Sequence, residues 1–203
     1  MGRRNAKPAR RRAKQDRAQE TVAVVLEAAA QVLQREGYAR ATTNRIAKTA
    51  GVSVGTIYQY FNDKDEIFDA LIRREIDGLQ KVLRDAASVP HESMSDALRR
   101  LLMAFVRTRP EAPALYRSLE QVPNALFRRR VAAARGGVVQ WVREFLARHS
   151  RELRVQDLDT AAFVIVSAAE GVAMNASPEF YRGRGADELA SLFTRYLTKR
   201  PDD

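Results

Sequence analysis

The side chains best suited to recognition chemistry lie between positions 42 and 64, where hydrogen-bond donors alternate with small residues. Hydroxyl, amide, guanidinium and ammonium groups donate hydrogen bonds to phosphate oxygens and to base edges, and small residues permit close approach to either. These groups therefore suit recognition of a nucleic acid. The candidate DNA-binding residues that this pattern indicates are Ser53, Val54, Gly55, Thr56, Tyr58, Gln59, Tyr60 and Lys64.

No spacing typical of catalysis or metal binding accompanies these donors in the sequence. The chain has no Cys, which excludes disulfides, thiolate zinc sites, iron–sulfur clusters and a Cys nucleophile. His91 and His149 are far apart, and no Ser–His–Asp set, Gly-rich phosphate loop or His-Glu-x-x-His pattern occurs. We therefore expect no catalytic residue, no metal site and no cofactor. An enzyme built on a helical pocket is a rival that only turnover of a bound ligand would support.

Positive charge is concentrated at the start of the chain. The 203 residues carry a net charge of +10, and residues 1–17 contain eight basic residues and one acid. Such a block indicates a nucleic-acid or an anionic membrane partner. We interpret it as a disordered arm that lies along phosphates or enters a minor groove. A solvated arm without a role stays open, whereas a transit peptide would need an apolar face that these residues lack.

Apolar residues at steps of three and four predict helices in the first third of the chain. One stripe runs from Val22 to Leu33, and Gly37 follows where a C-cap glycine is expected. Thr42 or Thr43 is expected to cap a second helix that Gly51 ends. Ser53 then caps a third helix to about Tyr60, and Asp63-x-x-Glu66 forms a capping box for a fourth.

The remaining two thirds show the same helical period. Helices are expected to begin at Ser93 or Ser95, at Pro123-Asn124 and at Asp157, with a last one through Leu189–Leu197. A short helical piece is expected around 110–119. No alternating strand pattern occurs, so the sequence predicts an all-α fold of about nine helices.

Residues 18–60 have the features of a helix-turn-helix. Ala47 is small enough for close approach of the next helix, Gly51 permits a sharp turn, and Val52 and Ile57 fill the junction. The third helix is short, polar and nearly uncharged, which suits the major groove of a duplex.

The pattern Gly51-Val52-Ser53-x-Gly55-Thr56-x-Tyr58-x-Tyr60-Phe61, followed by Lys64, resembles the TetR family of bacterial transcriptional regulators. The resemblance covers about residues 18–68. It implies a homodimer with an N-terminal three-helix DNA-binding domain and a larger helical domain for an inducer and for dimerisation. Members are mostly repressors that a small molecule releases from operator DNA.

Roles for individual positions follow from this resemblance. Thr43, Tyr58, Tyr60 and Lys64 would contact the DNA backbone. Val54, Gly55 and Thr56 would lie near the bases. The family often has Lys or another polar residue where this chain has Val54, which cannot hydrogen-bond a base but can pack on a thymine methyl. More of the base reading is therefore expected from Asn44, Arg45 and Gln59.

Domain boundaries follow from these assignments: an arm at 1–17, a DNA-binding domain at 18–64, and a ligand-binding and dimerisation domain at 65–203. The candidate ligand-binding residues are Phe105, Tyr116, Trp141, Phe145, Phe163 and Asn175. Plain core packing is the alternative for each aromatic residue.

The segment Ala161–Ala173 is apolar nearly all round, so it must be buried on several sides. We place a two-fold interface on the last two helices, with burial inside one subunit as the alternative. The most apolar run, Ala161–Ala169, is shorter than the ~18 residues that span a bilayer. We expect no membrane partner and a cytoplasmic location.

Taken together, the sequence predicts a ligand-responsive, sequence-specific regulator that binds double-stranded DNA at a near-palindromic operator as a homodimer. A small-molecule inducer would release it. The alternative is a basic, sequence-tolerant binder of the nucleoid type that acts through its arm alone. Deleting residues 1–17 would abolish binding by the second kind of protein and only weaken binding by the first.

Overall fold

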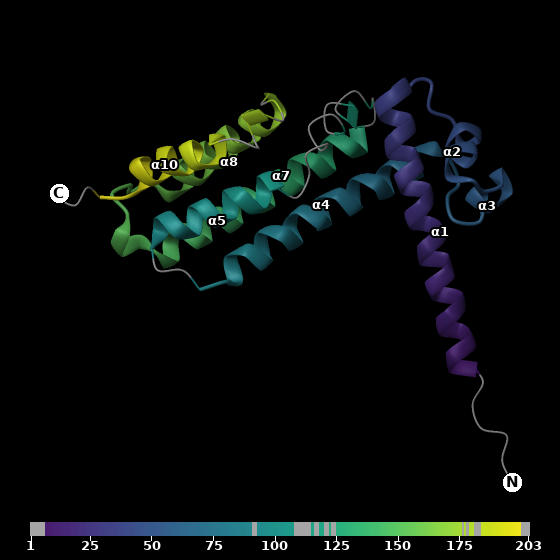
Figure 1. Cartoon of the computed structure of the whole chain (residues 1–203), viewed down its shortest axis with the longest axis horizontal. Helices are drawn as coiled ribbons and strands as arrows, with labels where there is room; N and C mark the ends of the chain where they lie inside the picture. Colours follow the sequence, from purple (N-terminus) through teal and green to yellow (C-terminus); the bar gives the residue numbers. More distant parts are fainter. Residues whose placement is uncertain are drawn as a thin grey trace, which may run out of the picture. The chain divides into compact units, whose positions relative to one another are not determined.

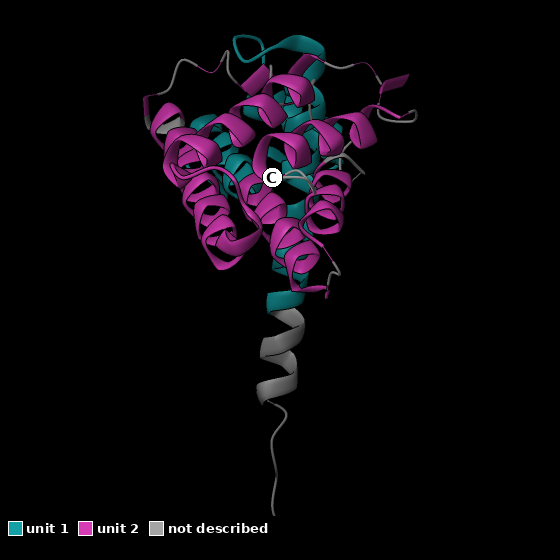
Figure 2. Ribbon diagram, turned by 90° about the vertical axis from the view of Figure 1, so that its left-hand side faces the viewer, with its two compact units in different colours: residues 1–73 teal, residues 74–203 magenta. Residues whose placement is uncertain are grey.

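The computed structural model describes residues 7–90, 93–107, 125–175 and 184–199, with isolated positions between these ranges. It divides into two compact units, residues 1–73 and 74–203, which Figure 2 colours separately. The described residues form eight α-helices and one short 3-10 helix, with a single isolated β-bridge between Leu153 and Thr198. The all-α prediction is confirmed. Most of the short helical piece expected around 110–119, including Tyr116, lies outside the described residues.

The first unit contains α1 (Lys7–Glu36), α2 (Thr43–Ala50), α3 (Val54–Tyr58) and the start of α4 (Lys64–Ser88) (Figure 1). Gly37 ends α1 with a φ of +73°, the conformation expected of a C-cap glycine. Apolar side chains that recur at helical spacing are buried between these helices. The largest of them are Val25, Val32, Leu33, Ile46, Ile57, Ile67, Phe68 and Leu71.

Helix α1 begins earlier than its apolar stripe indicates. The sequence predicts a disordered arm at residues 1–17, whereas the structure has residues 7–17 as the first turns of α1. The segment is rich in Ala, Arg, Lys and Gln, which have high helix propensity. Its one proline, Pro8, lies in the first turn, where it removes no helical hydrogen bond.

The second unit contains most of α4 and the helices α5 (Met94–Arg107), α7 (Ala125–Arg148), α8 (Leu158–Asn175) and α10 (Gly185–Leu197). Helix α5 packs against α10 and α7 packs against α8 (Figure 1). The main members of their shared core are Met94, Leu98, Leu102, Phe145, Leu146, Ile165, Leu189, Phe193 and Leu197.

Polar contacts fix the ends of these helices. Asp157 caps α8, because its carboxylate accepts hydrogen bonds from Thr160 Oγ1 at 2.6 Å and Thr160 N at 3.0 Å. The same hydrogen bonds lower the pKa of Asp157. Just after the 3-10 helix (Ser150–Glu152), Arg154 N donates a hydrogen bond to Leu197 O at 2.8 Å. This hydrogen bond holds the C-terminal end of α10 against the segment that follows the 3-10 helix.

Helix α8 is longer than the apolar run seen in the sequence. Among the described residues it is the one helix that is long and apolar enough, by length and composition, to cross a membrane. That is weak evidence for a span, since core helices of other proteins pass the same test. Four of its residues, Ala161, Ala162, Ile165 and Val166, are buried in the unit.

Candidate DNA-binding surface

Helix α2 is positioned by its cap and by two buried residues. Thr42 is the N-cap, and its Oγ1 accepts a hydrogen bond from Arg45 N at 3.3 Å. Ile46 and Ala47 are buried on the inner side of the helix. Asn44 and Arg45 are exposed on the other side, where a duplex can reach them.

The turn between α2 and α3 depends on Gly51. This residue has a φ of +69°, the left-handed region that non-glycine residues rarely adopt. Its N–H donates to Lys48 O at 3.4 Å, and Val52 N donates to Ala47 O at 3.1 Å. The turn therefore satisfies the last carbonyls of α2 and redirects the chain within two residues.

Helix α3 is short and is held by its N-cap. Ser53 Oγ accepts a hydrogen bond from Thr56 N at 3.0 Å and lies 2.8 Å from Thr56 Oγ1. Ile57 is the buried residue that anchors the helix. Gly55, Tyr58 and Gln59 are exposed. The remaining candidates on or just after α3, namely Val54, Thr56 and Tyr60, are half-buried.

Thr43 and Tyr58, two residues predicted to contact the DNA backbone, lie next to each other in the helix-turn-helix. Thr43 Oγ1 of α2 is 3.4 Å from Tyr58 OH of α3, and Tyr58 is 56% exposed. Hydroxyl groups so placed can each donate to a phosphate oxygen. The structure thus brings residues 15 positions apart into one hydroxyl pair.

Arg45 has a partner that the sequence does not indicate. Its guanidinium forms an ion pair with the Glu36 carboxylate at the end of α1, while Arg40 Nε donates to Glu36 O at 3.2 Å. The sequence predicts that Arg45 reaches bases. In the free protein its charge is directed to Glu36, so a base contact requires exchange of this ion pair.

Lys64 also has an intramolecular role. Its ammonium lies 4.1 Å from the centroid of the Tyr38 ring and donates to Tyr38 O at 3.2 Å. Tyr38 OH donates to the Asp65 carboxylate, and the Tyr38 ring lies 5.4 Å from that of Phe68. Burial raises the pKa of Tyr38, and the hydrogen bond to Asp65 raises it further.

Sequence reasoning missed Tyr38. These contacts join residues about 26 positions apart, and helical periodicity carries no information over that distance. A single aromatic residue directly after the C-cap Gly37 was the available signal. The fourth-helix cap was predicted correctly: Asp63 Oδ1 accepts from Glu66 N, and Glu66 Oε2 accepts from Asn62 N, both at 2.8 Å.

The candidate ligand-binding residues are scattered over the second unit. Phe145 is 3% exposed in the core and stacks on Trp141 at 6.1 Å, whereas Phe163 is 52% exposed. Asn175 donates through Nδ2 to Gly171 O at 2.8 Å, and Phe105 is half-buried. The structure brings Trp141 and Phe145 together and does not bury Phe163 with them.

An arginine that was not among the candidates links α7 to α8. Arg135 Nε donates to Glu170 Oε2 and Arg135 Nη2 to Ser167 Oγ, both at 2.7 Å. Its guanidinium carbon lies 5.2 Å from the Phe163 ring centroid. The sequence signal for this contact is Glu170, an acid that follows directly after the apolar run Ala161–Ala169 of α8.

Capped helices, a glycine turn and exposed donors define this region as a helix-turn-helix DNA-binding unit. Two family models match the chain: "Bacterial regulatory proteins, tetR family" over residues 25–71 and "Tetracyclin repressor-like, C-terminal domain" over residues 93–197. Together they cover most of the chain. The chain therefore belongs to the tetR family of bacterial regulatory proteins, as its sequence motif predicted.

Individual relatives agree with this assignment. A nucleoid occlusion factor, SlmA, of Haemophilus ducreyi is 31% identical over 142 residues, 67% of this chain and 70% of the relative. The HTH-type transcriptional regulator TtgR of Pseudomonas putida is 37% identical over 93 residues, 46% of this chain and 44% of the relative. A solved SmeT–triclosan complex shares the fold, with a TM-score of 0.72 and 21% identity over 90% of this chain and 93% of the other.

Proposed function

We propose that this protein is a dimeric transcriptional repressor that binds a near-palindromic operator and releases it when a small molecule binds. The observation that carries the proposal is the folded helix-turn-helix. Buried Ile46 and Ile57 anchor its two helices, and exposed Asn44, Gly55 and Gln59 face outward. A short, nearly uncharged helix of this kind suits direct contact with base edges in the major groove.

Dimerisation through α8 and α10 is the second part of the proposal. Three large apolar residues remain exposed on these helices: Phe163 is 52% exposed, Val164 41% and Leu192 58%. Removing this apolar surface from water favours pairing with a second copy. A two-fold dimer would set its recognition helices about 34 Å apart, the repeat of successive major grooves.

The small molecule would bind in the second unit and act through α4, which runs from the DNA-binding unit into the second unit. A ligand changes DNA affinity only through its differential affinity for two dispositions of this helix. A solved protein with the same fold is in complex with triclosan, which supports a small-molecule ligand for this chain. We expect the protein to act in the cytoplasm, where its operator DNA lies.

Selection from random duplex DNA by the purified protein tests the proposal, at about 150 mM salt to weaken phosphate attraction. We expect a near-palindromic motif with two half-sites about one helical turn apart. Recovery of no motif, with binding that disappears as the salt concentration rises, would contradict it. That result would restore the sequence-tolerant, nucleoid-type alternative, which the folded helix-turn-helix does not favour.

A further inference from the structure

Glu36 is the last residue of α1, a position that does not favour an acid. The C-terminal end of a helix carries partial negative charge, which repels a carboxylate. The stability of α1 alone therefore gives no reason for glutamate here. The ion pair between the Glu36 carboxylate and the Arg45 guanidinium joins the end of α1 to α2, and it supplies a reason.

Arg45 is the side chain on which the Glu36 carboxylate depends. The oxygen that faces Arg45 Nη1 is Glu36 Oε2, and this oxygen is shielded from water. Arg40 is nearer in the sequence, but its Nε donates to the main-chain oxygen of Glu36 at 3.2 Å. In the part of the chain that the structure describes, Arg45 is the one side chain that pairs with this carboxylate. A charge that is partly withdrawn from water needs such a partner.

The Arg45 side chain is nevertheless accessible from outside the protein. It is 51% exposed, whereas the side chain of Glu36 is 27% exposed. Its planar group carries five N–H donors and matches a phosphate or the O6 and N7 atoms of guanine. The donor that pairs with Glu36 is not available to a duplex at the same time. The carboxylate and the duplex therefore compete for this guanidinium.

The exposure of the pair favours exchange over a permanent contact. Ion pairs that are open to solvent contribute little free energy, because water and salt screen them. A bidentate contact between arginine and guanine is stronger than such a pair. Arg45 is therefore expected to move from Glu36 to the duplex at the right sequence, without unfolding of α1 or α2.

We propose that Glu36 is an intramolecular competitor of DNA for Arg45 and thereby lowers the affinity of the protein for its operator. The inference rests on the proposed function, since it concerns the affinity of the same helix-turn-helix. In the free protein, Glu36 holds Arg45. Binding to the duplex breaks this ion pair and leaves a negative carboxylate close to the phosphates. Both effects oppose binding.

A lowered affinity suits a repressor that a small molecule has to release. The ligand shifts the equilibrium only by its differential affinity for the two states of the protein. A protein that binds its operator less tightly is released by a smaller difference. Glu36 would therefore make the operator complex easier for the ligand to dissociate.

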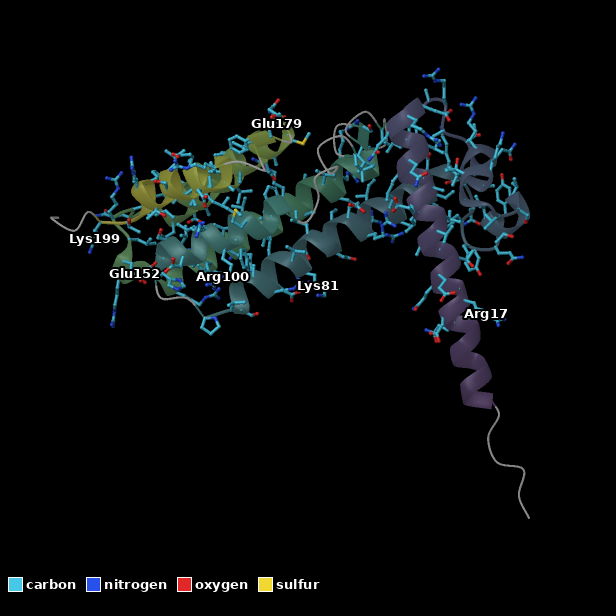
Figure 3. The ribbon with its side chains drawn as sticks, viewed as in Figure 1. Arg17, Lys81, Arg100, Glu152, Glu179 and Lys199 are labelled. Atoms are coloured by element: carbon cyan, nitrogen blue, oxygen red, sulfur yellow. The ribbon has the colours of Figure 1, made fainter. Side chains whose placement is uncertain are left out.

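The test is a double-mutant cycle in the full-length protein. The wild type, Glu36→Gln, Arg45→Ala and the double variant are compared on a selected duplex and on a random duplex, between about 50 and 200 mM salt. Glu36→Gln keeps the size of the side chain and removes its charge. The control, Glu20→Gln, removes the same charge from an exposed position of α1, about one turn after Arg17, which Figure 3 labels.

We expect Glu36→Gln to bind the selected duplex about fivefold more tightly than the wild type at low salt, and more tightly than the control. On the random duplex, the slope of log affinity against log salt should become steeper by about 0.9, because the released Arg45 neutralises one more phosphate. In the Arg45→Ala background, removing the Glu36 charge should have no larger effect than the control substitution.

Three results would overturn the proposal. An additive cycle would show that Glu36 does not act through Arg45. Equal tightening by Glu36→Gln and Glu20→Gln would show a general effect of charge. Weaker binding by Glu36→Gln that disappears without Arg45 would show that Glu36 orients Arg45 for the duplex. If the wild type selects no motif, the proposed function fails, whereas the cycle on the random duplex still tests the competition.

Discussion

Gly55 lies exposed on α3, and the nearest atom to a Cβ built on it is Ser53 Oγ at 3.7 Å. That distance is ordinary van der Waals contact, and the φ of Gly55 is not positive. Folding therefore does not require glycine here. A surface that must approach bases or phosphates closely does benefit from the missing side chain.

Replacing Gly55 by Ala should lower the affinity for DNA without lowering the stability of the fold. We expect the free energy of unfolding to stay equal or rise by about 0.5–1 kcal/mol, because alanine favours helix over glycine. Affinity for the selected duplex should fall about tenfold. Urea denaturation and fluorescence anisotropy measure the two effects.

The matched control is Gly136→Ala on α7, where a Cβ would meet nothing within 4 Å. It should gain similar stability and keep wild-type DNA affinity. Unchanged DNA affinity in Gly55→Ala would show that α3 does not approach the duplex at this point.

Single-residue roles were the least predictable part of the site. The exposure of Asn44 and Gln59 agrees with the helical period, because Ile46, Ala47 and Ile57 occupy the buried positions of α2 and α3. The partners of Arg45 and Lys64 could not be predicted from the helical period, because only the tertiary fold brings Glu36 and Tyr38 close to them. Sequence spacing alone does not tell whether a polar side chain contacts DNA or another residue of its own chain.

At the scale of elements, the turn at Gly51 is under a defined backbone constraint. A Cβ there would meet nothing within 4 Å, so any cost of substitution comes from the φ of +69°. Gly51→Ala should lower the free energy of unfolding by about 1–2 kcal/mol. Gly51→Asn should cost less, since asparagine adopts this conformation more readily.

Urea denaturation of both variants measures this cost. Gly137→Ala on α7 is the control, because its added Cβ also meets nothing within 4 Å and its φ is not positive. It should be neutral or stabilising. Equal stability of Gly51→Ala and the wild type would contradict the left-handed turn.

The start of α4 is held to the end of α1 by the Tyr38 contacts with Lys64, Asp65 and Phe68. Tyr38→Phe keeps the ring and removes only the hydrogen bond to Asp65. We expect the free energy of unfolding to fall by about 0.5–1.5 kcal/mol at pH 7, the net value of one hydrogen bond. Tyr58→Phe, which changes an exposed hydroxyl, should cost less.

The pKa of Tyr38 adds a pH dependence to this prediction. Because the folded pKa is raised above the usual value of about 10, the stability from the neutral phenol is complete below that pH and is lost as pH rises above it. The stability difference between the wild type and Tyr38→Phe should therefore narrow above about pH 10. Denaturation series at increasing pH would reveal a constant difference if this assignment is wrong.

Helix boundaries were predicted where capping chemistry is local. Thr42, Ser53, Asp63 and Asp157 all act as N-terminal caps, as their spacing from the following residues indicated. The start of α1 was not predicted, because the charge of residues 1–17 suggested disorder whereas their helix propensity favours a helix.

At the scale of the whole molecule, the proposed dimer depends on the apolar residues left exposed on α8 and α10. The sequence predicted that α8 needs burial on several sides, and periodicity could not tell a partner subunit from the same chain. Arg135 lies beside exposed Phe163 and is itself held by Glu170 and Ser167. This contact fixes the aromatic ring in the surface that we assign to the partner.

Phe163→Glu or Leu192→Glu should therefore give monomers, because a carboxylate would have to be desolvated in the interface. Operator affinity should fall together with dimerisation, since one subunit binds only one half-site. Sedimentation equilibrium measures the first effect and anisotropy the second. Val89→Glu, at another exposed apolar residue, is the control and should remain dimeric. Dimers of unchanged stability in both interface variants would place the interface elsewhere.

The central claim is that the helix-turn-helix reads base sequence, and parallel duplex selections test it most directly. The wild type would be compared with Asn44→Ala, Val54→Ala and Gln59→Ala. We predict that the wild type selects a near-palindromic motif and that variants lose base preference at symmetric pairs of positions, with about 1–3 kcal/mol weaker binding to the original site. The same motif from all four proteins, or no motif from any of them, would contradict base reading by α2 and α3.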